Sequence, residues 1–456
     1  MSSPSEPYGK PTEPSDALSE AGTVIDEHAD EKPKPAVEDV EGRGRGGAPA
    51  RKSDKTRLAF SKLVPAGVSY QVVFWICALW LFGSLYKCSE KTHNLHIVVA
   101  DFDGGSVGSA LLSAVSSTTG PSTAPTYVVL PASSTSPEDI QKKVFDGKYW
   151  GGVWAAEGAT SRFEAAVNGG GGSYNASEAI YYTGLEVRYN TVWTGYVLTA
   201  ITKLVALTTA TFNRESVAPL LTASSTSYSS SAAAVLVNPI GSTYVDQTPF
   251  KFGTRIVINT LGYVFPTLFC FFFLMALNSI GALTGWYKNM SVRRHLKFRI
   301  SIGAVWTLLS SLSVMGWFLM FSESYTVGAS SFFALWAMTW VYCMITYDLL
   351  DVMTAYVPPQ FLSHLLVLYI MTGVAAVLFP LDLMSPFFKI QYALPSHSTW
   401  GAMITAFGHG AVNRLHIDLP ILAAWFVVTK VALVFSIRRR ARLGRETVTA
   451  VEKDKH

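Results

Sequence analysis

Hydrophobic residues are concentrated in six long blocks along this chain, and a polar segment separates the first block from the other five. A transmembrane helix needs about 20 predominantly apolar residues, and each block is close to that length. The pattern therefore predicts an α-helical polytopic membrane protein with six transmembrane helices. The blocks are Val64–Tyr86, Ile256–Leu277, Ile300–Phe321, Ser331–Tyr347, Phe361–Phe379 and Leu419–Ile437.

The polar segment after the first block alternates between short β-branched runs and helical periodicity. His96–Asp101 predicts a strand, and a glycine-containing turn and a helical pattern follow it. Alternation of this kind is typical of an α/β layer with at least partly parallel strands. Further strands are predicted at Tyr127–Leu130, Trp150–Ala155 and Ala179–Thr183, and helices at Val107–Val115, Pro137–Phe145, Ala159–Val167 and Val192–Phe212.

The positions of lysine and arginine predict the topology. Residues 43–62 hold seven basic residues and one acidic residue directly before the first block. Lys288–Arg299 holds five basic residues and no acidic one, and the basic run Arg438–Arg442 follows the last block. Because short loops rich in lysine and arginine stay in the cytoplasm, six crossings place both termini inside and the polar segment outside.

These patterns divide the chain into five parts. Residues 1–50 have almost no large apolar groups to offset chain entropy, so a disordered tail is expected, either phosphorylated or without a specific role. The parts are a disordered cytoplasmic tail with a basic collar (1–62), transmembrane helix 1 (63–86), an extracellular α/β domain inserted between helix 1 and helix 2 (87–254), a five-helix membrane domain (255–437) and a basic cytoplasmic tail (438–456).

The composition is that of a membrane protein, and the sequence limits the metal, cofactor and nucleotide chemistry that the chain is expected to have. Hydrophobic residues make up 49% of the chain, charged residues make up 15%, and the mean hydropathy is +0.28. Three of the four cysteines lie in apolar blocks, and Cys88 outside them is expected to be an inert thiol, or a palmitoylation site if its side of the membrane is reversed. With no metal-ligand spacing and no phosphate-binding P-loop motif, we expect no metal, no cofactor and no ATP hydrolysis.

Ionisable residues at membrane depth are candidates for a functional site, because a charge in lipid is costly. Four stand out: Lys430 in the last block, Asp348 and Asp351 at the end of the fourth, and His364 early in the fifth. The aspartates are one helical turn apart and share a face that is able to pair with Lys430. The alternatives are a snorkelling Lys430 and aspartates that solvate a helix end. The absence of a chain of buried carboxylates disfavours a proton-coupled antiporter.

Two polar motifs in the outer segment have simple explanations. Asp101 and Asp103 are spaced as paired carboxylates, but the glycines directly after them favour a turn over a catalytic site. Those glycines match a dinucleotide-binding loop only in part, which excludes that function. Asn175 begins an N-glycosylation sequon in a glycine-rich loop that is expected to lie outside.

An outer loop separates the fifth block from the sixth. Ala393–Phe407 in this loop is predicted to be an interfacial or re-entrant helix. Proline and glycine near both ends of the loop bend the backbone, and bent backbone near a membrane must be buried in protein or face water. A vestibule and a plain connecting loop both meet that requirement.

The order of these elements, together with two motifs, resembles the fungal nitrosoguanidine-resistance protein family. The motifs are HIVVADFDGGSVGSALL at His96–Leu112 and VFDGKYWGGV at Val144–Val153, and the run from Leu394 to Trp425 also fits. More distantly, the chain is similar to the membrane subunits of ABC-2 type exporters and to bacterial phage-infection (Pip/YhgE-like) proteins. The resemblance implies a polytopic plasma-membrane protein linked to resistance to toxic compounds, with no catalytic residues to transfer.

The expected function is therefore that of a membrane protein, not an enzyme, that confers resistance to toxic small molecules through an exporter-like membrane domain. Because the chain encodes no energy source, export needs a separate ATPase or another membrane partner, and a homo-oligomer is also compatible. The alternative is a non-transporting organiser that binds lipid or a partner protein and alters membrane composition or stress tolerance. The outer segment mixes ten basic with twelve acidic residues, so the expected partner is the lipid bilayer and not nucleic acid.

Overall fold

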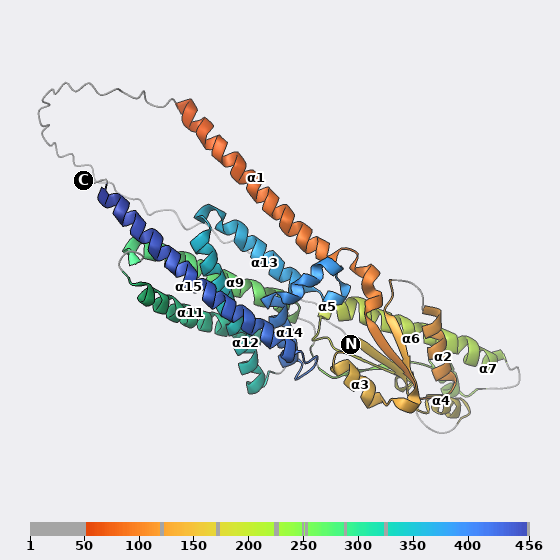
Figure 1. Ribbon diagram of the computed structural model, residues 1–456. Helices are drawn as coiled ribbons and strands as arrows, with labels where there is room; N and C mark the ends of the chain where they lie inside the picture. Colours follow the sequence, from red (N-terminus) through yellow and green to blue (C-terminus); the bar gives the residue numbers. More distant parts are fainter. Residues whose placement is uncertain are drawn as a thin grey trace, which may run out of the picture. The chain divides into compact units, whose positions relative to one another are not determined.

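The computed structural model describes residues 52–118, 123–169, 174–222, 228–248, 250, 254–286, 290–322 and 327–453 (Figure 1). The chain divides into two units, Met1–Ser61 and Lys62–His456. In the first unit the described residues are the start of helix α1 (Lys52–Leu85), and the disorder predicted for residues 1–50 lies outside the described part.

A five-stranded mixed sheet forms the centre of the α/β domain. β1 is parallel to β2 and to β3, β4 is antiparallel to β3, and β5 is parallel to β4. The predicted, partly parallel sheet is confirmed, but β5 was not predicted because every side chain on this short strand is at least partly exposed. In spatial order the strands are β2 (Thr126–Leu130), β1 (His96–Asp101), β3 (Gly151–Ala155), β4 (Ile180–Gly184) and β5 (Ser242–Asp246).

Helices cover both faces of this sheet. Helix α6 (Thr199–Phe212) covers one face, where a Cβ added at Gly151 would lie 3.1 Å from Ile201. Helix α3 covers the other, where a Cβ at the neighbouring Gly152 would lie 2.5 Å from Ile140. Helix α2 packs beside α6 (Figure 1). The other helices of the domain include α2 (Ser106–Thr118), α3 (Pro137–Phe145), α4 (Ala159–Val167) and α8 (Ser230–Val237).

The turn after β1 is held by its two aspartates. Asp101 Oδ1 accepts hydrogen bonds from the backbone N–H groups of Asp103 and Gly104, both at 3.0 Å. Asp103 accepts from two backbone N–H groups at the start of α2 and from the backbone and hydroxyl of Thr160 at the start of α4. Both carboxylates therefore serve in turn and helix-capping hydrogen bonds, as the following glycines predict.

A continuous helical stretch from Asn190 to Thr222 lies against the sheet. It combines α5 (Asn190–Val192), a π-helical turn η4 (Trp193–Leu198), α6 (Thr199–Phe212), a second π-helical turn η5 (Asn213–Val217) and α7 (Ala218–Thr222). Lys203, Arg214 and Glu215 are exposed on it. Most of its buried residues recur every three to four positions and form one stripe, as in an amphipathic helix packed on a core. The residues of this stripe are Trp193, Val197, Ile201, Leu204, Thr208 and Phe212, and Val192 and Val217 are also buried.

The described residues hold seven helices that are long and apolar enough to cross a membrane. Two of them are Leu63–Asn94 and Asn190–Thr222. The chain is thus mostly helical and polytopic, as predicted. Helix α1 exposes large apolar side chains such as Trp75, Leu79 and Phe82, which suits a helix surrounded by lipid. The other five helices contain α9 (Ile258–Thr284), α11 (Val292–Met320), α12 (Ala329–Tyr356), α13 (Leu362–Leu378) and α15 (Leu415–Lys453).

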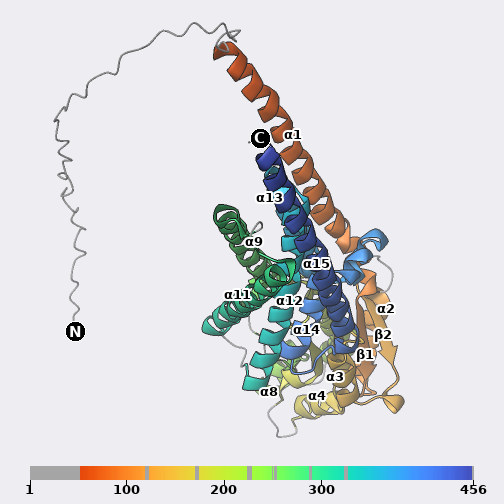
Figure 2. The ribbon, with the colours of Figure 1, turned by 60° about the vertical axis from the view of Figure 1, so that its left-hand side comes forward.

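Helix α12 is the central member of this bundle. It packs against α9, α11 and α15 (Figure 2). It also packs against α14 (Pro395–Phe407), and α14 contacts α13 and α15 as well. Nearly every residue of α14 is buried, so the helix predicted to be interfacial or re-entrant is enclosed by protein.

Residues 380–414 join the α/β domain to the bundle. The Val412 backbone N–H donates a hydrogen bond of 2.8 Å to the Phe145 carbonyl at the end of α3. The Asn94 side chain donates to the Asp382 carbonyl at 2.9 Å. One hydrophobic core continues from the sheet into α14. The domain and the bundle therefore pack as one body.

Candidate functional site

An apolar groove of about 560 Å³ lies between α12 and α15. Met344 and Phe426 line it, and Asp348 and Lys430 come four residues later on the same two helices. Because residues four apart share a helix face, the groove leads to these two charged residues. Every lining residue is apolar: Ala334, Ala337, Met338, Val341, Met344, Leu419, Leu422, Ala423, Phe426 and Val427.

Lys430 and Asp348 form an ion pair between α15 and α12. Lys430 Nζ lies 2.8 Å from Asp348 Oδ2, and the two side chains are 28% and 2% exposed. Lys430 Nζ also lies 5.2 Å from the centre of the Phe426 ring, which lines the groove. The lysine is therefore the partly exposed member of the pair and lies near a ring that lines the groove, whereas the aspartate is buried.

Asp351 lies in a second cluster and does not contact Lys430. Its carboxylate accepts a hydrogen bond from Arg299 and forms an ion pair with Arg440, whose Nη2 lies 2.8 Å from Oδ1. Arg440 also donates to the Asp351 backbone carbonyl at 2.7 Å. Arg440 also donates to the Thr354 hydroxyl at 2.6 Å, and both arginines donate to the Asn278 side-chain oxygen. We call Asn278, Arg299, Asp351, Thr354 and Arg440 the four-helix polar cluster, because they tie α9, α11, α12 and α15 together.

The basic segment Lys288–Arg299, predicted to be a loop, is largely helical. Helix α11 begins at Val292, where the Ser291 hydroxyl accepts a hydrogen bond from the Arg294 backbone. Arg299 therefore lies in the second turn of a helix, and its side chain is only 2% exposed. The prediction of a loop was wrong from residue 292 onward, because a serine N-cap starts the helix before the apolar block begins.

His364 is not part of either group of charges. Its Nε2 lies 3.0 Å from the Ser69 hydroxyl, and its ring stacks on Tyr70 with centroids 3.9 Å apart. Both partners belong to α1. His364 therefore fixes α1 against α13, and the structure gives it a packing role.

Asn175 and Cys88 both lie in the α/β part of the chain. Asn175 is exposed at the start of the short helix η3 (Ala176–Glu178), and its side-chain nitrogen lies 3.0 Å from Glu178 Oε1. The sequon is thus accessible on the surface. Cys88 is a half-buried free thiol whose sulfur lies 3.3 Å from the Tyr196 hydroxyl.

Sequence reasoning missed the partners of Asp351. Arg299 and Arg440 were interpreted as topology determinants, and Asn278 was not singled out. A signal was present in the segment that forms α11, because buried polar and small residues recur along it, mostly every three to four positions. These residues are His295, Arg299, Gly303, Thr307, Ser310 and Ser311. In the part of the chain that the structure describes, no group of three or more His, Cys, Asp or Glu residues has the arrangement of a metal site.

These features define a polytopic helical membrane protein that carries a folded α/β domain between α1 and α9. Residues 66–431 match the model of a family described as a protein of unknown function, DUF3533, and the chain belongs to that family. The family description names no activity, so the resemblance to the nitrosoguanidine-resistance proteins stays a prediction.

Comparison with curated proteins and with solved structures gives no match. The function therefore has to be argued from the groove and from the charged residues beside it.

Proposed function

We propose that this protein is an exporter-like plasma-membrane protein that lowers the cell's exposure to toxic amphiphilic small molecules. The observation that supports this is the groove between α12 and α15, which has only apolar walls and ends beside the Lys430–Asp348 ion pair. An amphiphile matches this site because its apolar body fits the apolar walls of the groove and its polar group reaches Lys430.

Six of the seven long apolar helices are proposed to span the membrane. The exception is Asn190–Thr222, because its buried stripe faces the sheet and its other side carries Lys203, Arg214 and Glu215. A lipid-facing helix has the opposite distribution, with large apolar groups outward, as α1 has at Trp75 and Phe82.

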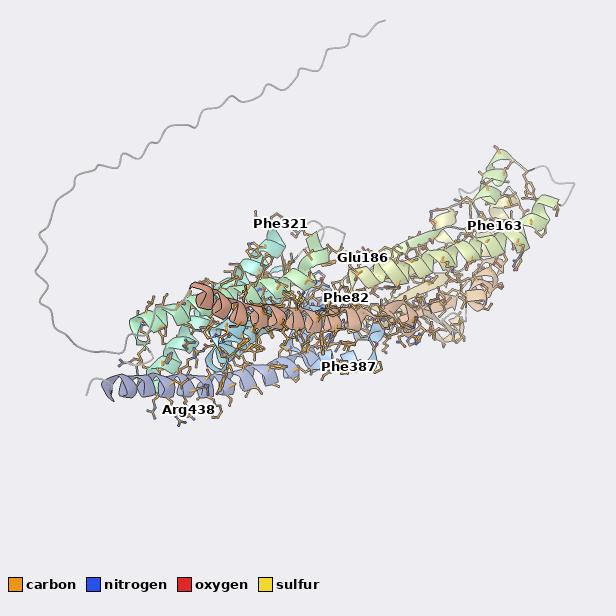
Figure 3. All side chains as sticks on the ribbon, turned by 90° about the horizontal axis from the view of Figure 1, so that it is seen from above. Phe82, Phe163, Glu186, Phe321, Phe387 and Arg438 are labelled. Atoms are coloured by element: carbon orange, nitrogen blue, oxygen red, sulfur yellow. The ribbon has the colours of Figure 1, made fainter. Side chains whose placement is uncertain are left out.

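The proposed topology puts both termini in the cytoplasm and the α/β domain outside. It is supported by the basic residues Arg438, Arg439 and Arg442, which follow the last apolar block. Figure 3 shows Arg438 on the part of α15 that is remote from Phe163 of the α/β domain.

Cysteine labelling tests this topology. Asn175→Cys and Arg438→Cys introduce thiols at two exposed positions, each in a chain that also carries Cys88→Ser to remove the half-buried native thiol. On intact cells, a membrane-impermeant maleimide is expected to label Asn175→Cys directly and Arg438→Cys only after permeabilisation. Labelling of both positions from the same side would contradict the five crossings proposed between them, because an odd number of crossings places the two positions on opposite sides of the membrane.

Export also needs energy, which we propose to come from a separate ATPase or another membrane partner, since the sequence contains no P-loop motif. The protein then provides the path for the amphiphile, and the partner provides the energy that makes transport run outward. The purified chain alone would then allow flux only down a concentration gradient.

Filling the groove is expected to stop that flux. Ala423 lines the groove and is exposed, whereas the neighbouring Ala424 is also exposed and does not line it. We expect Ala423→Trp to reduce flux of the anionic dye carboxyfluorescein, whose carboxylates suit Lys430, about tenfold. The added indole removes apolar contacts between dye and groove, and losing the equivalent of two methylene groups costs roughly 1.6 kcal/mol. The measurement is dye efflux from liposomes that contain the full-length protein.

The matched control is Ala424→Trp, which adds the same side chain outside the groove and should leave flux within about twofold of the unmodified protein. Dye loss no faster than from protein-free liposomes would refute a transport path. Saturable dye binding without flux, removed by Ala423→Trp, would instead favour the non-transporting organiser.

A further inference from the structure

A second cavity, of about 260 Å³, lies where the α/β domain meets residues 380–414. The loop after β4 provides one wall, and the short helices η8 (Leu381–Leu383) and η9 (Pro386–Ala393), α14 and the residue before α15 provide the other. The cavity therefore exists only because the domain is docked on the bundle. The charged and aromatic residues that the argument uses are Arg188, Tyr189, Lys389, Tyr392, His397 and Arg414.

The cavity wall carries more positive than negative charge. Arg188, Lys389 and Arg414 are its cations, and Asp382 is a carboxylate in the same wall. Asp418, beside Arg414, is a second carboxylate. Three cations against two carboxylates leave a net charge of +1, which attracts an anion.

The two carboxylates do not satisfy the two guanidinium groups. Arg188 lies 3.8 Å from Asp382, and Arg414 lies 3.9 Å from Asp418. Hydrogen-bonded pairs of this type are about 2.7–2.9 Å long, so both contacts are Coulombic and leave hydrogen-bonding capacity on the guanidinium groups. Lys389 is exposed and, within the described residues, forms no ion pair.

Aromatic rings hold both arginines in place. The guanidinium carbon of Arg188 lies 3.6 Å from the centre of the Trp150 ring, and that of Arg414 lies 5.2 Å from the Tyr392 ring. A guanidinium whose face is stacked on a ring still presents its edge, and that edge fits two oxygens of one anion. Burial lowers the pKa of Arg188 to about 10 while Asp382 opposes the shift, so the group stays cationic at neutral pH.

The rest of the wall selects for an apolar portion and a hydrogen-bond donor. Tyr189 and Ile404 are buried and line the cavity. His397 is 4% exposed, its Nδ1 lies 3.2 Å from the Ala376 carbonyl, and its Nε2 has no partner among the described residues. With the proton on Nδ1, Nε2 is an acceptor and suits a protonated phosphate oxygen.

Backbone strain marks the same wall. Val412 lines the cavity with φ of +51°, a conformation that is unusual for a β-branched residue. Its hydrogen bond to Phe145 holds it there. Strained residues of this kind are concentrated at ligand-binding sites, where the surrounding structure fixes them.

We propose that this cavity binds a phosphate monoester with a small apolar or aromatic group, and that Arg188, Arg414 and Lys389 hold the phosphate. The phosphate belongs either to a soluble ester or to a lipid headgroup. A cavity of this size takes a ligand smaller than a typical drug-sized molecule. The proposal is independent of transport through the groove between α12 and α15.

Binding is tested on the full-length purified protein with three probes: inorganic phosphate, phenyl phosphate and dihexanoyl phosphatidic acid. Calorimetric titration and the shift in the thermal unfolding midpoint give the affinities. We expect phenyl phosphate to bind about tenfold more tightly than inorganic phosphate, because its ring is buried against the aromatic wall. Benzoate, with the same ring and a single charge, should bind more weakly than phenyl phosphate.

Two variants link binding to the cavity. Lys389→Gln removes an exposed charge and should weaken binding about threefold. Arg414→Lys keeps the positive charge beside Asp418 but loses the planar guanidinium edge that donates two hydrogen bonds to one anion, and should weaken binding about tenfold. Lys203→Gln, at an exposed lysine of α6, is the matched control and should bind as the unmodified protein does.

Binding of phenyl phosphate assigns a soluble ester, and binding of phosphatidic acid alone assigns a lipid headgroup. Either result supports the phosphate site if the Lys389 and Arg414 variants weaken it. The proposal is overturned if none of the three phosphates binds saturably, or if both variants bind as tightly as the Lys203 control.

Discussion

Replacing Asp351 by alanine should lower the free energy of unfolding of the full-length protein by about 3–5 kcal/mol. The Asp351 side chain is fully buried between Arg299 and Arg440, whose side chains are 2% and 9% exposed. Its removal leaves two buried guanidinium groups without the carboxylate that compensates them. Unfolding in mixed micelles of dodecyl maltoside and sodium dodecyl sulfate measures the loss.

Two comparisons isolate the four-helix polar cluster as the cause. Glu164→Ala removes an exposed carboxylate of α4 and should change the free energy by less than about 0.5 kcal/mol. The triple variant Arg299→Met/Asp351→Leu/Arg440→Met leaves none of the three charges and should recover much of the loss. If Asp351→Ala costs no more than Glu164→Ala, the cluster does not hold the bundle together.

Replacing Trp193 by alanine should also cost about 3–5 kcal/mol of unfolding free energy. Trp193 is 1% exposed and fills the space over Gly184, where an added Cβ would lie 1.8 Å from the indole ring. It also packs near Tyr244, with ring centroids 5.8 Å apart. The loss therefore reports how firmly the stretch Asn190–Thr222 is docked on the sheet, and the same mixed-micelle titration measures it.

Trp75→Ala is the matched control for this second experiment. Trp75 is 66% exposed on α1, where lipid is expected to surround it, so truncating it should cost far less than truncating Trp193. Equal losses for the two variants would contradict the docking of Asn190–Thr222 on the sheet and would reopen its assignment as a membrane span.

Elements with strong local signals were predictable. Helix α3 begins at Pro137 because Ser136 and Asp139 form a capping box, and both residues are visible in the sequence. Strand β1 is a β-branched run followed by glycine and was predicted with the observed bounds. In contrast, β5 is an edge strand without an apolar run, and the π-helical turns η4 and η5 depend on backbone hydrogen bonding that residue spacing does not encode.

The candidate site was predictable only in part, for a related reason. Helical periodicity places Asp348 where Lys430 is able to reach it, and the structure has that pair. The same argument made Asp351 a possible partner of Lys430, with solvation of the helix end as the alternative, but its partners are Arg299 and Arg440. A basic residue at the edge of an apolar block gives the same sequence signal whether it is solvated or buried, so tertiary packing alone decides which of the two occurs.

The bonds between Asn94 and Asp382 and between Lys91 and Ser385 join residues that are 288 and 294 positions apart. At a synthesis rate of about 5–20 residues per second, roughly 15–60 s pass between the appearance of the two partners on the ribosome. During that interval the surface of the newly made domain that later contacts residues 380–414 stays exposed to solvent. A chain truncated before residue 380 never covers this surface, so premature termination is expected to yield a product for proteolytic disposal and not a shorter working protein.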